Sequence, residues 1–138
     1  MRKRVGDICR LKLPNGLYAF GRVFKDAAIG VYRQLSDDSS YVPNDDEYMF
    51  IVGIYNSSLR QWEKVGHKDF ISEEESWPPP EYTVDPITKR YSIYYKGVFT
   101  LSSYDECKGL EEAAVWENSH IIDRIMGNNK WQNDIHRH

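Results

Sequence analysis

Apolar and polar residues alternate along the first part of the chain, the period-two pattern of a half-buried β-strand. Cys9, Leu11 and Leu13 alternate with basic residues, and a second alternating run covers residues 18–24. Pro14-Asn15-Gly16 separates the two runs, and this sequence suits a tight turn because proline fixes φ and Asn-Gly tolerates positive φ. Residues 5–25 therefore predict a hairpin, and we expect it to begin the sheet on which the rest of the chain packs.

Further strands are predicted along the next 75 residues. An alternating run at 26–35 predicts a third strand, and the continuous apolar run 48–55 predicts a strand buried on both faces. The shorter runs predict three further elements. A returning strand is predicted at 62–66, a longer hairpin at 82–84 with 91–95, and one more strand at 98–101. Acidic and serine-rich stretches separate these runs. Ser72 to Glu75 has the form of a capping box, but the prolines at 78–80 limit it to a single helical turn.

The C-terminal part of the sequence predicts a helix. Ser103-Tyr104-Asp105-Glu106 has the form of a capping box, no proline follows before Met126, and Gly127 is a natural stop. At helical spacing, one apolar stripe is formed by Cys107, Leu110, Ala114, Ile121 and Ile125. We therefore predict an α+β fold, mostly β: a strongly bent antiparallel sheet or partly open barrel covered by one long C-terminal helix.

Size and composition indicate a single cytoplasmic domain. The 138 residues suit one domain, 1–138, with a frayed tail expected at 128–138. No apolar run approaches the ~20 residues of a membrane span, and the basic start at residues 1–4 lacks the apolar region of a signal peptide. The two cysteines, Cys9 and Cys107, make no disulfide framework, and we interpret them as core residues.

Charge is distributed unevenly along the chain, whose formal net charge is −3. Residues 1–35 carry a net +6, residues 36–81 carry a net −8, and residues 82–138 carry a net −1. The acidic middle disfavours a nucleic-acid ligand there and favours a basic partner, because opposite fields steer encounter. A solvated acidic surface is the plainer interpretation for any single residue in this zone.

The common signatures of catalysis, metal binding and phosphate binding are missing from the sequence, so we predict no cofactor, no metal and no catalytic residue. Glu117, His120 and Arg124 fall on one flank of the predicted helix; an ion-pair row is favoured over a general base with its orienting neighbours. Trp116 is expected to pack beneath another segment. Trp77, beside three glutamates, is either an exposed anchor for a basic partner or a packed residue.

Three segments resemble the immunity protein 26 family of bacterial polymorphic toxin systems. They are Gly6–Val23, the short Trp62–Gly66, and the closing run Cys107–Glu111, Ala113–Trp116 and Ile121–Ile125. The resemblance implies a cytoplasmic antidote that binds and blocks a cognate toxin domain, often a nuclease, and has no catalysis of its own. It carries over no shared toxin-contact residues.

We therefore hypothesise that the chain neutralises a toxin domain by occluding its basic surface, with no nucleic acid and no membrane as partners. The residues expected to contact the toxin lie in two acidic loops: Asp37, Asp38, Asp45, Asp46 and Glu47 in one, and Glu73, Glu74, Glu75 and Trp77 in the other. One alternative is a small β-barrel that binds nucleic acid through the basic N-terminal third, with Tyr18 and Phe20 as stacking platforms. Another is a hydrolase that uses Glu117 and His120.

Overall fold

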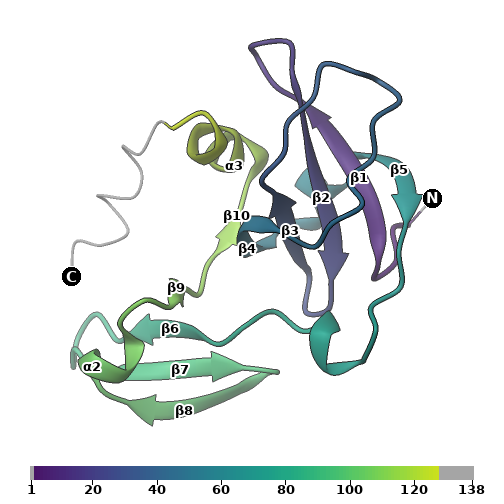
Figure 1. The fold of residues 1–138 in the computed structure, drawn as a ribbon. Helices are drawn as coiled ribbons and strands as arrows, with labels where there is room; N and C mark the ends of the chain where they lie inside the picture. The colour runs from purple at the N-terminus through teal and green to yellow at the C-terminus, as the bar shows by residue number, and fades with distance from the viewer. Residues whose placement is uncertain (1, 128–138) are drawn as a thin grey trace.

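The computed structural model describes residues 2–127, which form two β-sheets and several short helical segments (Figure 1). The larger sheet has six strands in the order β10-β4-β3-β2-β1-β5, and the smaller has four in the order β8-β7-β6-β9. The strands of the larger sheet are β1 (Asp7–Lys12), β2 (Tyr18–Phe24), β3 (Ala28–Tyr32), β4 (Tyr48–Ile54), β5 (Glu63–His67) and β10 (Val115–Trp116). Those of the smaller sheet are β6 (Glu81–Val84), β7 (Tyr91–Tyr95), β8 (Val98–Ser102) and β9 (Glu111–Glu112).

The opening hairpin is confirmed. β1 and β2 pair antiparallel from Ile8 opposite Arg22 to Lys12 opposite Tyr18. The turn is closed by the Leu13 amide, which donates to the Leu17 carbonyl at 2.8 Å, and Gly16 takes a positive φ of 87° that a glycine adopts without strain. β2, β3 and β4 then pair antiparallel in sequence order. The sequence predicted strands at these positions but not the order in which they pair.

The main core lies on one face of the six-stranded sheet. Ile29 of β3, Ile54 of β4 and Trp62, which directly precedes β5, are at most 1% exposed, and Trp116 and Ile121 join them from the C-terminal part. Trp116 stacks on Phe50 with ring centroids 6.0 Å apart, so its predicted packing is confirmed. Burying side chains of this size removes about 1.5–3 kcal/mol of unfavourable hydration each, which makes this cluster the principal stabilising element.

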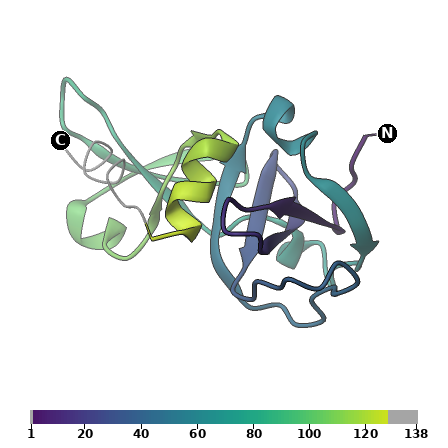
Figure 2. The ribbon, with the colours of Figure 1, turned by 90° about the horizontal axis from the view of Figure 1, so that it is seen from above.

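The four-stranded sheet extends away from the larger one (Figures 1 and 2). β6 and β7 form the predicted hairpin, and β8 pairs with β7 as the outer edge. A one-turn 3-10 helix, η1 (Glu74–Ser76), precedes the prolines, as the sequence predicted. The two sheets touch where Tyr94 donates through its hydroxyl to Asp26 at 2.5 Å. Glu81 and Tyr94, which are opposite each other in β6 and β7, therefore share the face that is turned toward the six-stranded sheet.

The prediction of one long C-terminal helix is wrong. The chain forms α2 (Tyr104–Cys107), β9, β10 and then α3 (Asn118–Ile125), so the predicted apolar stripe does not exist. The capping box itself is real, since Ser103 Oγ accepts from the Glu106 amide at 3.2 Å. The helix nevertheless stops after one turn, and Gly109 follows with a φ of 81°.

Pairing with distant strands replaces the predicted helix. β9 pairs parallel with β6, and β10 pairs parallel with β4. A glycine at position 53 of β4 makes the second pairing possible, because a Cβ there would lie 2.8 Å from the Ala114 carbonyl oxygen. Two sheets therefore form instead of one covered sheet, and the described residues contain no closed barrel.

α3 lies against the larger sheet (Figure 2), and a buried polar network holds it there. Trp62 donates through Nε1 to Asn118 Oδ1 at 2.8 Å, and Asn118 Nδ2 donates to the Ser58 carbonyl at 2.8 Å. Ser58 belongs to α1 (Asn56–Leu59), the one-turn helix between β4 and β5. Asn118 is only 7% exposed, so these hydrogen bonds replace water that it cannot reach.

Both cysteines are buried and unpaired, which confirms their interpretation as core residues. None of the helices within residues 2–127 is both long enough and apolar enough to cross a bilayer. The tail predicted at 128–138 lies outside the described residues.

Candidate partner-binding surface

The first acidic loop joins β3 to β4 and is shaped by its own side chains. Asp38 Oδ1 accepts from the Ser40 hydroxyl at 2.7 Å and the Ser40 amide at 2.8 Å, and these bonds hold the pKa of Asp38 below its usual value. Asp45 Oδ1 accepts in the same way from the Glu47 amide at 2.9 Å. Asp37 and Glu47 are exposed and form no ion pair among the described residues. The charges of these four side chains therefore remain available to a partner.

Asp46 has a different role, because two cations of this chain already hold it. Its Oδ1 accepts from Arg22 Nη1 at 3.1 Å and from Lys68 Nζ at 3.0 Å. Arg22 is only 2% exposed and also donates to the Lys68 carbonyl and to the Tyr48 hydroxyl. Its guanidinium lies 3.7 Å from the centroid of the Phe70 ring. Asp46 thus anchors the loop to a buried arginine, and much of its charge is neutralised inside the molecule.

Two glutamates of the second acidic loop are likewise engaged. Glu73 pairs with Lys25 at 2.7 Å, and Glu74 pairs with Lys96 and accepts from the Tyr95 hydroxyl at 2.8 Å. The hydrogen bond from Lys25 lowers the pKa of Glu73, and the one from Lys96 lowers that of Glu74. These pairs tie the loop to the β2–β3 turn and to the β7–β8 turn.

Glu75 and Trp77 complete the second loop. Glu75 is exposed and forms no ion pair within residues 2–127, while its amide donates to Ser72 Oγ at 3.3 Å. Trp77 is half-buried, with Lys25 Nζ 5.2 Å from its ring centroid. The tryptophan is therefore partly packed and partly available, which combines the two interpretations left open by the sequence.

The structure brings the two acidic loops together at one place. Asp46 from the first loop and Glu75 and Trp77 from the second line a shallow cavity of about 260 Å³. We call it the loop groove; its remaining walls are Arg22, Phe24, Tyr48, Ile51, Phe70 and Pro79. The groove does not include Asp37, Asp38, Asp45, Glu47, Glu73 or Glu74. Three of the nine predicted contact residues thus line the loop groove, and the other six do not.

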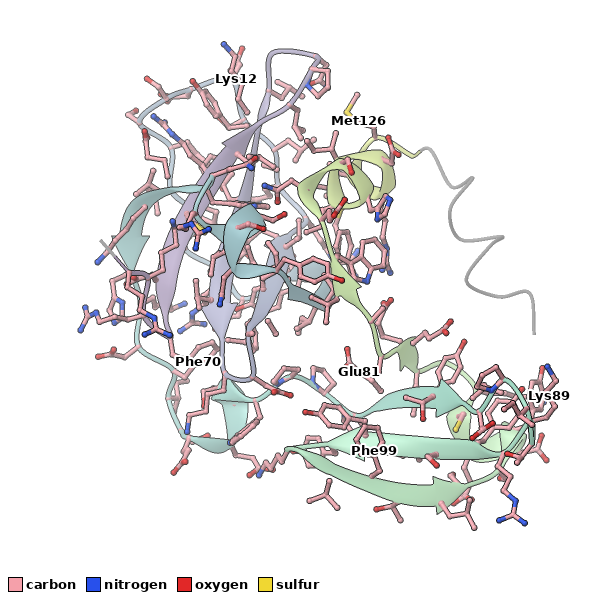
Figure 3. The ribbon with its side chains drawn as sticks, turned by 180° about the vertical axis from the view of Figure 1, so that it is seen from behind. Lys12, Phe70, Glu81, Lys89, Phe99 and Met126 are labelled. Carbon is pink, nitrogen blue, oxygen red and sulfur yellow. The ribbon has the colours of Figure 1, made fainter. Side chains whose placement is uncertain are left out.

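A second cavity of about 350 Å³ adjoins the loop groove, because Tyr48, Ile51 and Pro79 line both. We call it the inter-sheet cavity; it is lined in addition by Phe50, Pro80, Glu81, Gly109, Leu110 and Glu111. Glu81 lies between the two sheets (Figure 3) and is only 8% exposed. From the sequence, Glu81 counts only as one of the acids of residues 36–81 and is not a predicted site residue. Its position directly after three prolines, at the start of a strand, is the sequence feature that could have identified it.

Comparison with known proteins places this chain in a family. The family model for Immunity protein 26 matches residues 4–93, about two thirds of the chain, and the chain therefore belongs to that family. The match contains the opening hairpin and Trp62–Gly66 but ends before the closing run of the resemblance. No curated protein and no solved structure matches the chain. Membership of a family of immunity proteins indicates toxin neutralisation as the general role.

Proposed function

We propose that this chain neutralises a cognate toxin domain in the cytoplasm by stoichiometric occlusion, with no catalysis of its own. The toxin presents a basic surface, such as the lysines and arginines with which a nuclease contacts phosphate. Membership of the Immunity protein 26 family supports the role. The observation that carries the mechanism is the meeting of the two acidic loops at the groove lined by Asp46, Glu75 and Trp77.

The nine residues of the two acidic loops have three roles in this proposal. Asp46, Glu73 and Glu74 are ion-paired within the chain and hold the loops in position. Asp37, Asp38, Asp45, Glu47 and Glu75 form no ion pair among the described residues and supply the field that attracts a basic partner. Trp77 offers a rigid aromatic surface of the kind that anchors interfaces.

The first test is protection and complex formation. Cells that express the toxin gene encoded beside this one are expected to survive only when this chain is co-expressed, and the two purified proteins are expected to form a 1:1 complex. Absence of both protection and complex would refute the proposed function.

The second test addresses the acidic loops. Reversal of Asp45 and Glu47 to lysine leaves the Arg22–Asp46 pair intact and is expected to slow association roughly tenfold at low salt. It is also expected to reduce the salt dependence of the association rate, measured by stopped-flow fluorescence. The matched control reverses Asp105 and Glu117, two exposed acids outside both loops. Equal rates for the two variants would remove the first loop from the interface.

The nucleic-acid alternative loses the stacking platforms on which it depended. Phe20 is 0% exposed, and Tyr18 is half-buried with the guanidinium carbon of Arg10 4.5 Å from its ring centroid. Arg22, one of the basic residues of that third, is buried as well. The assignment of Phe20 as a base-stacking residue is therefore wrong.

The hydrolase alternative finds no supporting geometry in residues 2–127. Glu117 precedes α3 instead of lying within a long helix, and its side chain is not hydrogen-bonded to His120. Arg124 pairs with Glu111 through two bonds of 2.9 Å, so the predicted row with Glu117 does not form.

A further inference from the structure

Glu81 is a largely buried acid whose carboxylate has no hydrogen-bond donor and no cation among the described residues. Two carboxylates in the described residues are buried, and they differ sharply. Asp7, 1% exposed, accepts from the Arg4 amide at 2.8 Å, from His67 Nδ1 at 2.7 Å, and pairs with Lys64 at 3.3 Å. The side chain of Glu81, a residue 8% exposed, forms no hydrogen bond and no ion pair with any described residue, although its backbone pairs with Tyr94 and Glu111. Its carboxylate oxygens keep some contact with solvent, but a mostly buried carboxylate without a partner is still costly, so its retention calls for an explanation.

No group that lines the inter-sheet cavity donates a hydrogen bond to the Glu81 side chain. Pro79 and Pro80 form the adjacent wall and have no backbone N–H. Tyr48, Phe50 and Leu110 contribute mainly apolar surface. The cavity has two carboxylates, of which Glu111 is paired with Arg124 and Glu81 is not, and its other walls are mainly apolar. Such a cavity suits a ligand with an aliphatic stem and a cationic head.

The charged groups around Glu81 are acidic or already paired. Glu111 on β9 is held by Arg124, whose guanidinium also lies 4.1 Å from the Phe50 ring centroid. Asp26, in the β2–β3 turn, accepts from Tyr94 of β7. Burial, then Glu111, then Asp26 raise the pKa of Glu81 to about 7. The site therefore has an excess of negative charge and no cation of this chain committed to Glu81.

The position of the cavity indicates the source of a cation. It shares Tyr48, Ile51 and Pro79 with the loop groove, so a partner seated on the groove would lie next to the cavity that Glu81 lines. We propose that the inter-sheet cavity receives a cationic side chain, arginine or lysine, of the toxin, with Glu81 as its counter-ion. This inference rests on the proposed function and adds to it a specific anchoring contact.

The cavity can be tested without the toxin. Nα-acetyl-arginine amide is titrated into the ¹⁵N,¹³C-labelled chain at pH 8 and followed by NMR, with the uncharged isostere Nα-acetyl-citrulline amide as control. Shifts centred on the cavity are expected for the arginine compound alone. The lysine analogue, Nα-acetyl-lysine amide, distinguishes the two cations. Affinity is expected to fall fivefold to tenfold between pH 8 and pH 6, because protonation of Glu81 removes the counter-ion.

Glu81→Gln is expected to weaken binding of the arginine compound by roughly tenfold or more, whereas Glu117→Gln, which neutralises an exposed acid, leaves it unchanged. Equal shifts with the citrulline compound, or unchanged binding by Glu81→Gln, would overturn the proposal. In complex with the toxin, Glu81→Gln is expected to speed dissociation at least tenfold. A toxin complex that forms normally and is insensitive to Glu81→Gln overturns this inference alone, whereas absence of any complex overturns the proposed function.

Discussion

Replacement of Glu81 by glutamine is expected to stabilise the free protein at high pH and to lose this effect at low pH. The pKa of Glu81 is about 7 in the folded chain, against an ordinary value of 4.5. A carboxyl group whose pKa is raised by folding favours the folded state below pH 4.5, and this contribution is lost as pH rises through about 7. The ionised form is therefore a destabilising element at pH 8.

The magnitude follows from the two pKa values. Between pH 5 and pH 8 the wild-type chain loses about 2.5 kcal/mol of unfolding free energy through this one group, because the slope approaches about 1.4 kcal/mol per pH unit only between the two pKa values. Glutamine occupies the same volume and does not ionise. The difference in unfolding free energy between Glu81→Gln and wild type is thus expected to grow by about 2–3 kcal/mol from pH 5 to pH 8.

Urea unfolding followed by tryptophan fluorescence at pH 5, 6, 7 and 8 measures this difference. His67, whose pKa is raised by hydrogen bonds to Asp69 and Asp7, also contributes to the pH dependence of stability, but it is present in both proteins and its contribution cancels in the difference. Glu117→Gln is the matched control and is expected to show no trend. A stability difference that stays constant within about 0.5 kcal/mol from pH 5 to pH 8 would refute the argument that burial holds Glu81 protonated.

Three further substitutions test the structure. Asn118→Ala is expected to cost about 2–3 kcal/mol of unfolding free energy, because it leaves the buried Trp62 indole N–H without its acceptor; urea unfolding measures the loss. Arg22→Met is expected to cost about 2–4 kcal/mol in the same assay. The substitution leaves Asp46 without its buried partner, and it leaves the Tyr48 hydroxyl and the Lys68 carbonyl without the donor that Arg22 supplies. Phe99→Lys, on the exposed edge strand β8, is expected to change stability by less than about 0.5 kcal/mol and to raise the concentration at which the protein aggregates.

Each of these substitutions has a matched control in the chain. Asn56→Ala removes an exposed asparagine from α1, and Arg60→Met removes an exposed arginine. Both are expected to lie within about 0.5 kcal/mol of wild type. For the edge strand, Thr100→Lys changes a neighbouring exposed residue, and a similar gain in solubility there would show that charge on β8 matters more than loss of the Phe99 ring. An Asn118→Ala variant as stable as Asn56→Ala would contradict the role of the buried network.

The strands could be predicted from sequence because their signal is local. Alternation and turn residues within about ten positions fix each hairpin, and β1 to β8 lie where the sequence predicted strands. The C-terminal helix failed for the opposite reason. A capping box and the absence of proline are also local signals, but the structure of residues 108–117 depends on β4 and β6, which precede them by 30 to 60 positions. Nothing near Ala114 in the sequence shows that Gly53 leaves room for its carbonyl.

The candidate site shows the same limit. The two acidic loops were recognisable from composition, and they do meet at the loop groove. Their internal partners were not recognisable, because Lys25, Lys68 and Lys96 lie 22 to 48 residues away from the acids they pair with. Glu81 escaped notice because its burial is created by β4 and β9 together. The net charge of a segment does not show which of its acids form ion pairs within the chain and which remain unpaired on the surface.

The family match divides the residues that line the inter-sheet cavity into two sets, one inside the match and one outside it. Glu81, Tyr48 and the prolines lie within residues 4–93, which the family model matches, whereas Gly109, Leu110 and Glu111 lie outside it. One wall of the cavity and Glu81 thus belong to the matched part of the fold, and the opposite wall belongs to a segment that the match does not include. Exchange of the wall formed by 109–111 would change the shape presented to a cationic side chain while Glu81 kept its charge. We therefore expect substitutions at Leu110 to alter which toxin is bound, and substitutions at Glu81 to weaken binding of any toxin that inserts a cation.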